Sequence, residues 1–171
     1  MEKNNKQSSQ DIKNSMNAAC DIHYDLLDND VLCRTIGTMP PKPAVIANKN
    51  DTLDYVLNSL QSQKTGCVII VDDQKNPIGI FTERDYILKV ARHYSEYKDK
   101  SISEFMTKDP VVQTLDCTIA YALTLMSEGG FRNLPIVNEQ NIPVGIIAVK
   151  DVVDFIVGNF MNKLLSFPVE S

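Results

Sequence analysis

The chain has 171 residues with a formal net charge of −5, and 43% of them are hydrophobic and 23% charged. These values are typical of a globular protein with one ordinary domain or two small ones. The acidic balance gives no electrostatic footprint for nucleic acid or for an anionic membrane surface. No apolar run approaches the roughly 20 residues that span a bilayer. The first ten residues lack the apolar stretch of a signal peptide, so we expect a cytoplasmic protein.

Residues 1–32 form an N-terminal extension. Its first ten residues are polar and are expected to be disordered. Beyond them, apolar side chains and one histidine recur at helical spacing, at Ile12, Met16, Ala19, His23 and Leu26. This period predicts one amphipathic helix that packs on the rest of the chain or on a partner.

The four cysteines do not indicate a metal site. Cys67 and Cys117 lie among apolar neighbours and are predicted to be small core residues. Cys20, His23 and Cys33 lack the second close ligand pair that structural zinc usually needs. We expect no disulfide in a reducing compartment.

One pattern occurs twice in the chain. A shift of 66 residues aligns residues 52–90 with residues 118–156 without a gap, with ten identities in 39 positions. The aligned apolar positions mostly exchange like for like, so the duplication is real. The identical residues of the first copy are Thr52, Tyr55, Leu57, Ile70, Val71, Gln74, Pro77, Gly79, Ile80 and Asp85.

Each copy predicts the order β-α-β-β-α. Short strands are expected at 44–47 and 111–113, and amphipathic helices begin after Thr52 and Thr118, the second of them ending at Gly129-Gly130. Hairpins follow at 68–81 and 134–148, and final helices at 83–92 and 149–160. The predicted boundaries are 33–92 for the first repeat, 93–103 for a charged connector without apolar period, 104–162 for the second repeat and 163–171 for a tail. Units this small should share one core.

Two stretches carry a resemblance to a known family. Gly79-Ile80-Phe81-Thr82-Glu83-Arg84-Asp85-Tyr86 closes a hairpin and opens a helix, and Phe131-Arg132-Asn133-Leu134-Pro135-Ile136-Val137 begins the second hairpin. With the tandem repeat, they resemble the cystathionine-β-synthase-type (CBS) domain family over about residues 34–160. The resemblance implies a mixed α/β (α+β) fold in which two repeats form one CBS-pair module. It also implies clefts for adenosine-containing ligands, and a homodimer.

Thr82 and Asp85 allow two interpretations. In the first, they are a capping box that only stabilises the helix start. In the second, Asp85 accepts hydrogen bonds from ribose hydroxyls, while Thr82, the helix amides and Arg84 hold phosphate. In the second copy Ala148 replaces the threonine, so Lys150 and Asp151 predict a weaker second site.

The family resemblance implies further residues for the Asp85 cleft. Gly66 and Cys67 would lie near the phosphates, Val112 and Thr114 would line the cleft, and Arg132 and Asn133 would approach the adenine. For Arg132, a solvated surface position is the alternative.

The sequence favours a regulatory sensor that binds an adenine nucleotide (AMP, ADP or ATP) or S-adenosylmethionine and signals to an unidentified regulated protein. The alternative is a ligand-free interaction module that uses the CBS pair as a dimerisation scaffold. No nucleophile–base arrangement, metal cluster or glycine-rich phosphate loop is spaced for catalysis, so we expect neither an enzyme nor a required cofactor.

Overall fold

The computed structural model describes residues 29–166, and side chains within 31–161. The described chain forms two compact units. One contains residues 41–115 and 133–147, and it therefore combines most of the first repeat with the hairpin of the second. The other contains residues 29–40, 116–132 and 148–166. The amphipathic helix predicted around Ile12–Leu26 lies outside the described residues.

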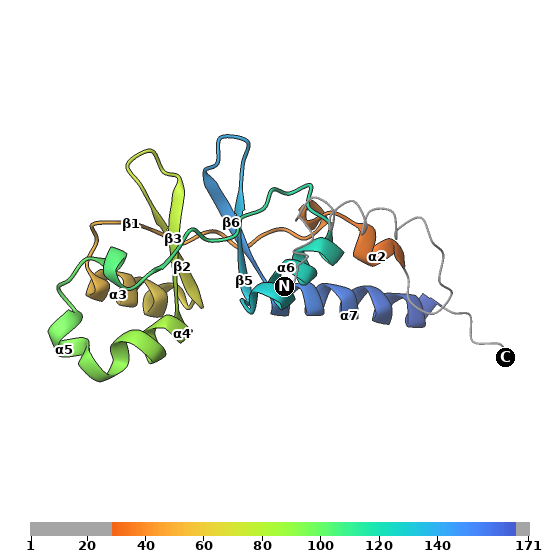
Figure 1. Cartoon of the computed structure of the whole chain (residues 1–171). Helices are drawn as coiled ribbons and strands as arrows, with labels where there is room; N and C mark the ends of the chain where they lie inside the picture. Colours follow the sequence, from red (N-terminus) through yellow and green to blue (C-terminus); the bar gives the residue numbers. More distant parts are fainter. Residues whose placement is uncertain (1–28, 167–171) are drawn as a thin grey trace, which may run out of the picture. The chain divides into compact units, whose positions relative to one another are not determined.

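A four-stranded sheet forms the centre of the unit built on residues 41–115 (Figure 1). Strand β1 (Ile46–Asn48) runs parallel to β2 (Cys67–Val71), which pairs antiparallel with β3 (Pro77–Thr82). Strand β4 (Thr107–Lys108) adds an antiparallel edge to β3. The predicted first strand at 44–47 is thus shifted to 46–48, because pairing to β2 starts at Ile46 opposite Ile69.

Helix α3 (Leu53–Gln63) connects β1 to β2 as the pattern predicts. The Thr52 hydroxyl accepts a hydrogen bond from the Tyr55 amide and so caps the helix. The apolar side chains of α3 pack on one face of the sheet, in the same core as residues of β2. Strand β2 is buried on both faces. The fully buried members of this core are Leu53, Val56, Val68, Ile70, Phe81 and Ile102.

The chain after β3 does not form the single helix predicted for 83–92. It forms a short α-helical turn, α4 (Glu83–Asp85), then a π-helical turn η2 (Tyr86–Val90) and a 3₁₀ turn η3 (Ala91–His93). Here i→i+5 bonds replace the regular helix pattern, a feature that is often found at functional sites. The π turn still directs Val90 into the core.

The connector forms helical turns although its sequence has no apolar period. It contains α5 (Tyr94–Tyr97) and the 3₁₀ turn η4 (Ile102–Glu104). The Tyr94 hydroxyl donates to Asp54, and the Tyr97 ring packs against the Phe105 ring with centroids 5.2 Å apart. Tyr94 and Tyr97 therefore fasten the connector to the first core.

The second hairpin, β5 (Asn133–Val137) and β6 (Pro143–Ala148), contributes to the same unit. Ile146 of β6 is buried together with residues of β2 and β3, so the hairpins of the two repeats share a core as expected. The residues of this second cluster are Cys67, Ile69, Val71, Ile80 and Ile146.

The segment that begins each repeat pairs with the other repeat. Thr107 and Lys108, near the start of the second repeat, pair with β3 of the first. Lys42, near the start of the first repeat, exchanges two backbone hydrogen bonds with Ile146 of β6, at 3.1 and 2.9 Å. The close approach at this point explains Gly145, because a Cβ there would lie 2.9 Å from the Lys42 carbonyl oxygen.

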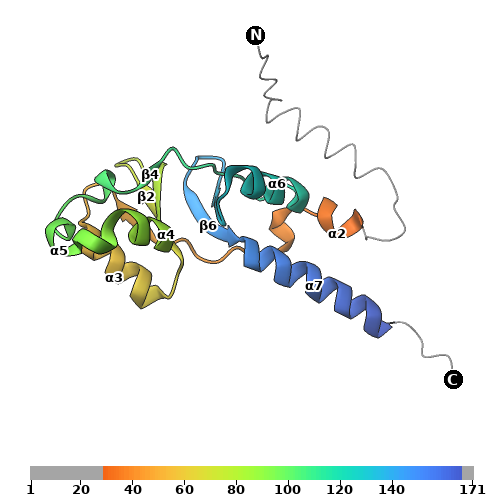
Figure 2. The ribbon, with the colours of Figure 1, turned by 60° about the horizontal axis from the view of Figure 1, so that its bottom comes forward.

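The other unit is helical (Figure 2). Helix α6 (Ile119–Gly129) contacts both α2 (Asn29–Cys33) and α7 (Val149–Ser166). Thr118 caps α6, and Gly130 ends it in the left-handed conformation, which confirms the predicted start and stop. A 3₁₀ turn, η1 (Ile36–Thr38), follows α2.

Candidate functional site

Asp85 and Thr82 form a complete capping box at the end of β3. The Thr82 hydroxyl accepts from the Asp85 amide at 3.2 Å, and Asp85 Oδ2 accepts from the Thr82 amide at 3.0 Å. The Thr82 hydroxyl also donates to Asp85 Oδ2 at 2.7 Å. The capping interpretation is therefore confirmed as far as the fold is concerned.

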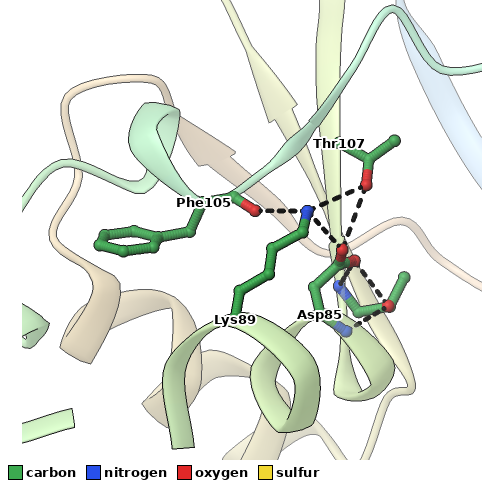
Figure 3. A network of polar contacts seen from close by, with 5 residues as sticks. Asp85, Lys89, Phe105 and Thr107 are labelled. Carbon is green, nitrogen blue, oxygen red and sulfur yellow. Dashed lines mark hydrogen bonds and ion pairs between the residues drawn. The ribbon is translucent and has the colours of Figure 1, made fainter. Parts of the chain in front are cut away.

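The other carboxylate oxygen of Asp85 faces Thr107, near the start of the second repeat (Figure 3). Lys89 Nζ lies 2.7 Å from Asp85 Oδ1, and the Thr107 hydroxyl donates to the same oxygen at 3.1 Å. Lys89 Nζ donates further to the Phe105 carbonyl oxygen at 2.9 Å. The carboxylate thus joins the start of a helix to strand β4.

Asp85 is 9% exposed and is the only charged residue among the buried side chains of the described chain. Burial by itself raises the pKa of its carboxyl group. Hydrogen bonds from Lys89 and Thr82 and the positive charge of Lys89 outweigh burial and hold the pKa below its ordinary value of 3.8. At neutral pH the site therefore contains a buried, ionised carboxylate.

Two of the residues predicted to lie near phosphate are adjacent to this cap. Cys67 pairs with Thr82 across β2 and β3, and the Gly66 carbonyl oxygen accepts from the Glu83 amide at 3.2 Å. A Cβ at Gly66 would meet only Glu83 Oε2, at 4.0 Å, so space is left there. The Cys67 thiol is buried in the core, and burial, with the negative charge of Glu83, raises its pKa to about 12. It packs as the sequence predicts.

The remaining predicted site residues lie at several places. Arg84 is exposed on the first turn after the cap. Val112 and Thr114 flank Gln113, which pairs with β5 through hydrogen bonds to Pro135 and Val137, and both are half-buried. No strand forms at 111–113 beyond this single bridge to Ile136.

Asn133 begins β5 and is half-buried in the same unit as Asp85, whereas Arg132 is exposed and belongs to the helical unit. The Arg132 carbonyl oxygen accepts from the Val149 amide at 2.9 Å. The shift of 66 residues aligns this bond with the one from the Glu83 amide to the Gly66 carbonyl oxygen in the first repeat. The predicted approach of Arg132 to Asp85 remains a prediction.

The second copy retains half of the cap. The Ala148 amide donates to Asp151 Oδ2 at 3.0 Å, which repeats the geometry at Thr82, but no hydroxyl completes the box. Lys150 is exposed and forms an ion pair with Asp154, which raises the pKa of the Lys150 ammonium.

Among residues 29–166, no group of three or more metal-ligating side chains comes together, and no helix is long and apolar enough to cross a membrane. Cys20 and His23 lie outside the described residues. Cys117 is buried among the core residues, as predicted. Cys33 is disulfide-bonded, so the expectation that no disulfide forms is wrong.

The family model for the CBS domain matches the chain twice, at residues 36–92 and 102–158. The chain belongs to the CBS-domain family. It contains two CBS repeats in tandem and is 31% identical over 106 residues to a 17.7 kDa protein of Acidianus ambivalens, and the match covers 62% of this chain and 63% of that protein.

Two solved CBS structures have the same fold. The CBS domain pair of protein MJ0100, in complex with 5′-methylthioadenosine and S-adenosylmethionine, has a TM-score of 0.65 and 23% identity, covering 74% of this chain and 98% of that one. CBSX2 in complex with AMP has a TM-score of 0.62 and 22% identity, covering 76% and 98%. At these identities the likeness shows the fold.

Sequence reasoning missed Lys89 and Thr107. The spacing of Lys89 four residues after Asp85 places both on one face of a helix and could have indicated an ion pair. No local pattern indicated Thr107, which is 22 residues from Asp85.

Proposed function

We propose that this CBS pair is a regulatory module that binds an adenine nucleotide or another adenosyl ligand at the capped helix start of the first repeat. The observation that carries the proposal is the buried, ionised Asp85 carboxylate beside the Thr82 hydroxyl. Charged side chains are almost never fully buried unless they are paired, and Asp85 is paired with Lys89. Here the capping role accounts for one carboxylate oxygen, and the second oxygen is the acceptor proposed for the sugar hydroxyls.

The ligand class is supported by two relatives of the same fold, whose structures contain AMP or S-adenosylmethionine with 5′-methylthioadenosine. Glu83 Oε2 beside Gly66 disfavours several negative charges at this place, because like charges repel. We therefore expect AMP, 5′-methylthioadenosine and S-adenosylmethionine to bind more tightly than ATP. Arg84, exposed on the same turn, is the cation proposed for the single phosphate of AMP.

Gly66, Cys67, Val112, Thr114, Arg132 and Asn133 remain proposed neighbours of this ligand. A second, weaker site is proposed at Lys150 and Asp151. Its affinity is lower because Ala148 supplies no hydroxyl, and the loss of one hydrogen bond to a charged group costs about 1.5–3 kcal/mol.

We further propose that the module is a homodimer that signals to a regulated protein without catalysing a reaction. Large apolar side chains are exposed on η2 and along α7. Ile87 and Leu88 are 67% and 71% exposed, and Phe160 of α7 is 61% exposed. Apolar surfaces of this kind commonly mark protein contacts. The other exposed members on α7 are Val153, Val157 and Met161.

Calorimetry of the full chain with AMP, ADP, ATP, S-adenosylmethionine and 5′-methylthioadenosine tests the ligand proposal. We expect Asp85→Ala to abolish the stronger binding event. Asp151→Ala is the matched control, since it removes the equivalent cap acceptor of the second repeat and should leave that event unchanged. The absence of heat and of a thermal shift with every ligand at millimolar concentration would refute the proposal.

The second candidate is a ligand-free interaction module. It is favoured by the same site, because the Asp85 carboxylate already has protein donors on both oxygens. On this view the N-terminal extension recruits a partner. The calorimetry distinguishes the two candidates, because the second predicts no heat with any adenosyl ligand. Deletion of residues 1–28 tests the extension: loss of self-association or partner binding assigns it to docking.

A further inference from the structure

Asp85 has no acceptor position left for a ligand. An ionised carboxylate offers about four lone-pair positions. The Thr82 amide and hydroxyl fill those of Oδ2, and Lys89 and the Thr107 hydroxyl fill those of Oδ1. Two sugar hydroxyls can therefore reach this carboxylate only if two of the present donors leave.

The donors on Oδ2 and Oδ1 differ in how firmly they are fixed. The Thr82 amide is part of the backbone at the helix start, and its hydroxyl also accepts from the Asp85 amide, so both belong to the cap. Lys89 is a flexible side chain that is 40% exposed. Thr107 belongs to the two-residue edge strand β4. The pair on Oδ1 is the exchangeable one.

Lys89 also supports strand β4. Its ammonium group has three protons, and they point to Asp85 Oδ1, the Phe105 carbonyl oxygen at 2.9 Å and Thr107 Oγ1 at 3.4 Å. Strand β4 also pairs with β3 at two positions, opposite Gly79 and Ile80, and the following Asp109 amide donates to the Ile78 carbonyl oxygen at 3.2 Å. Removing the lysine from the carboxylate therefore removes a tie between the helix start and the segment that leads into the second repeat.

We propose that Lys89 and Thr107 occupy, in the free protein, the acceptor positions that the vicinal hydroxyls of the ligand take, so that ligand binding releases β4 from the first repeat. The proposal rests on the proposed function for its ligand. In the second repeat the position equivalent to Lys89 is Phe155, which has no proton to donate. The exchange is thus confined to the first repeat, and the occupancy of one site is transmitted to the link between the repeats.

The first test compares ligand affinities of wild type, Lys89→Met and Thr107→Val, with Lys98→Met as the control. Lys98 is a surface lysine 3.9 Å from Asp99. Adenosine is the probe, because it has the two hydroxyls and no phosphate, and 2′,3′-dideoxyadenosine lacks both hydroxyls. We expect Lys89→Met to bind adenosine about ten- to a hundred-fold more tightly, since the ligand then fills a vacant acceptor instead of displacing a charged donor.

Thr107→Val should change adenosine affinity in the same direction, and neither substitution should change the affinity for dideoxyadenosine. Adenosine binding to folded Lys89→Met that is unchanged or weaker overturns the proposal, and a weaker value assigns Lys89 to a direct contact with the ligand. Far-UV circular dichroism verifies that each variant is folded.

The second test is hydrogen exchange of the peptide that contains residues 104–110. We expect faster exchange in ligand-free Lys89→Met than in wild type, and faster exchange in wild type when adenosine is bound. Lys98→Met should match wild type. If no variant binds any adenosyl ligand, the proposed function fails. The comparison of ligand-free proteins still tests the support of β4, and equal exchange in Lys89→Met and wild type overturns it.

Discussion

Ala148→Thr should stabilise the protein by restoring the hydroxyl that the second repeat lacks. The Ala148 amide already donates to Asp151 Oδ2 at 3.0 Å, the same length as the bond from the Thr82 amide to Asp85. In the first repeat the Thr82 hydroxyl also accepts from the Asp85 amide at 3.2 Å, and the alanine side chain at 148 has no oxygen for this role. Exchanging alanine for a good cap residue contributes about 0.5–2 kcal/mol. We expect a gain of about 1 kcal/mol, which raises the melting temperature by about 2–4 °C for a chain of this size.

The reverse change, Thr82→Ala, should cost more than Ala148→Thr gains. Besides capping, the Thr82 hydroxyl donates to the ionised Asp85 at 2.7 Å, and a hydrogen bond to a charged group contributes about 1.5–3 kcal/mol. Urea unfolding is followed by far-UV circular dichroism, because the chain has no tryptophan. The control for Ala148→Thr is Ala148→Val, because valine has the shape of threonine without the hydroxyl. If Ala148→Thr is no more stable than Ala148→Val, the equivalence of the two caps is refuted.

Two other predictions concern stability. Gly145→Ala should destabilise the protein by about 1–3 kcal/mol, because the added Cβ would lie 2.9 Å from the Lys42 carbonyl oxygen, whereas Gly79→Ala meets only the flexible Met106 side chain and should cost less. The reverse order in urea unfolding would contradict this. The pKa of Asp85 is depressed in the folded state, so its contribution to stability is present above pH 3.8 and is lost as the pH falls through the lower folded value. The stability difference between wild type and Asp85→Asn should therefore shrink below about pH 4, and a difference that is constant from pH 6 to pH 3 would contradict it.

Local patterns in the sequence predicted those parts of the fold that depend on neighbours in the chain. The caps at Thr52 and Thr118, the two hairpins and the buried positions of Cys67 and Cys117 all follow from residue type and short-range spacing. The capping box at Thr82 and Asp85 belongs to this group, because its members are three residues apart.

Features that depend on distant segments were missed or misplaced. The first strand begins at Ile46 because of its register with β2, which lies beyond an intervening helix. The sequence identifies residues 93–103 only as a charged connector without apolar period. Tyr94 and Tyr97 nevertheless find partners in Asp54 and Phe105 once the chain folds back. Similarly, Thr107, one of the two donors to Asp85 Oδ1, is 22 residues from Asp85 and lies beyond this connector.

The leading segments of the two repeats are exchanged, and this has a consequence for how such a protein can evolve. Lys42 and Ile146 hold one junction, and the pairing of Thr107 with Ile80 holds the other. A gene cut at the connector would yield two fragments, each missing the edge that its former neighbour supplied. Only two such fragments together could regain all the backbone bonds, so we expect the duplicated halves to be inherited, lost and fused to other genes as one indivisible block.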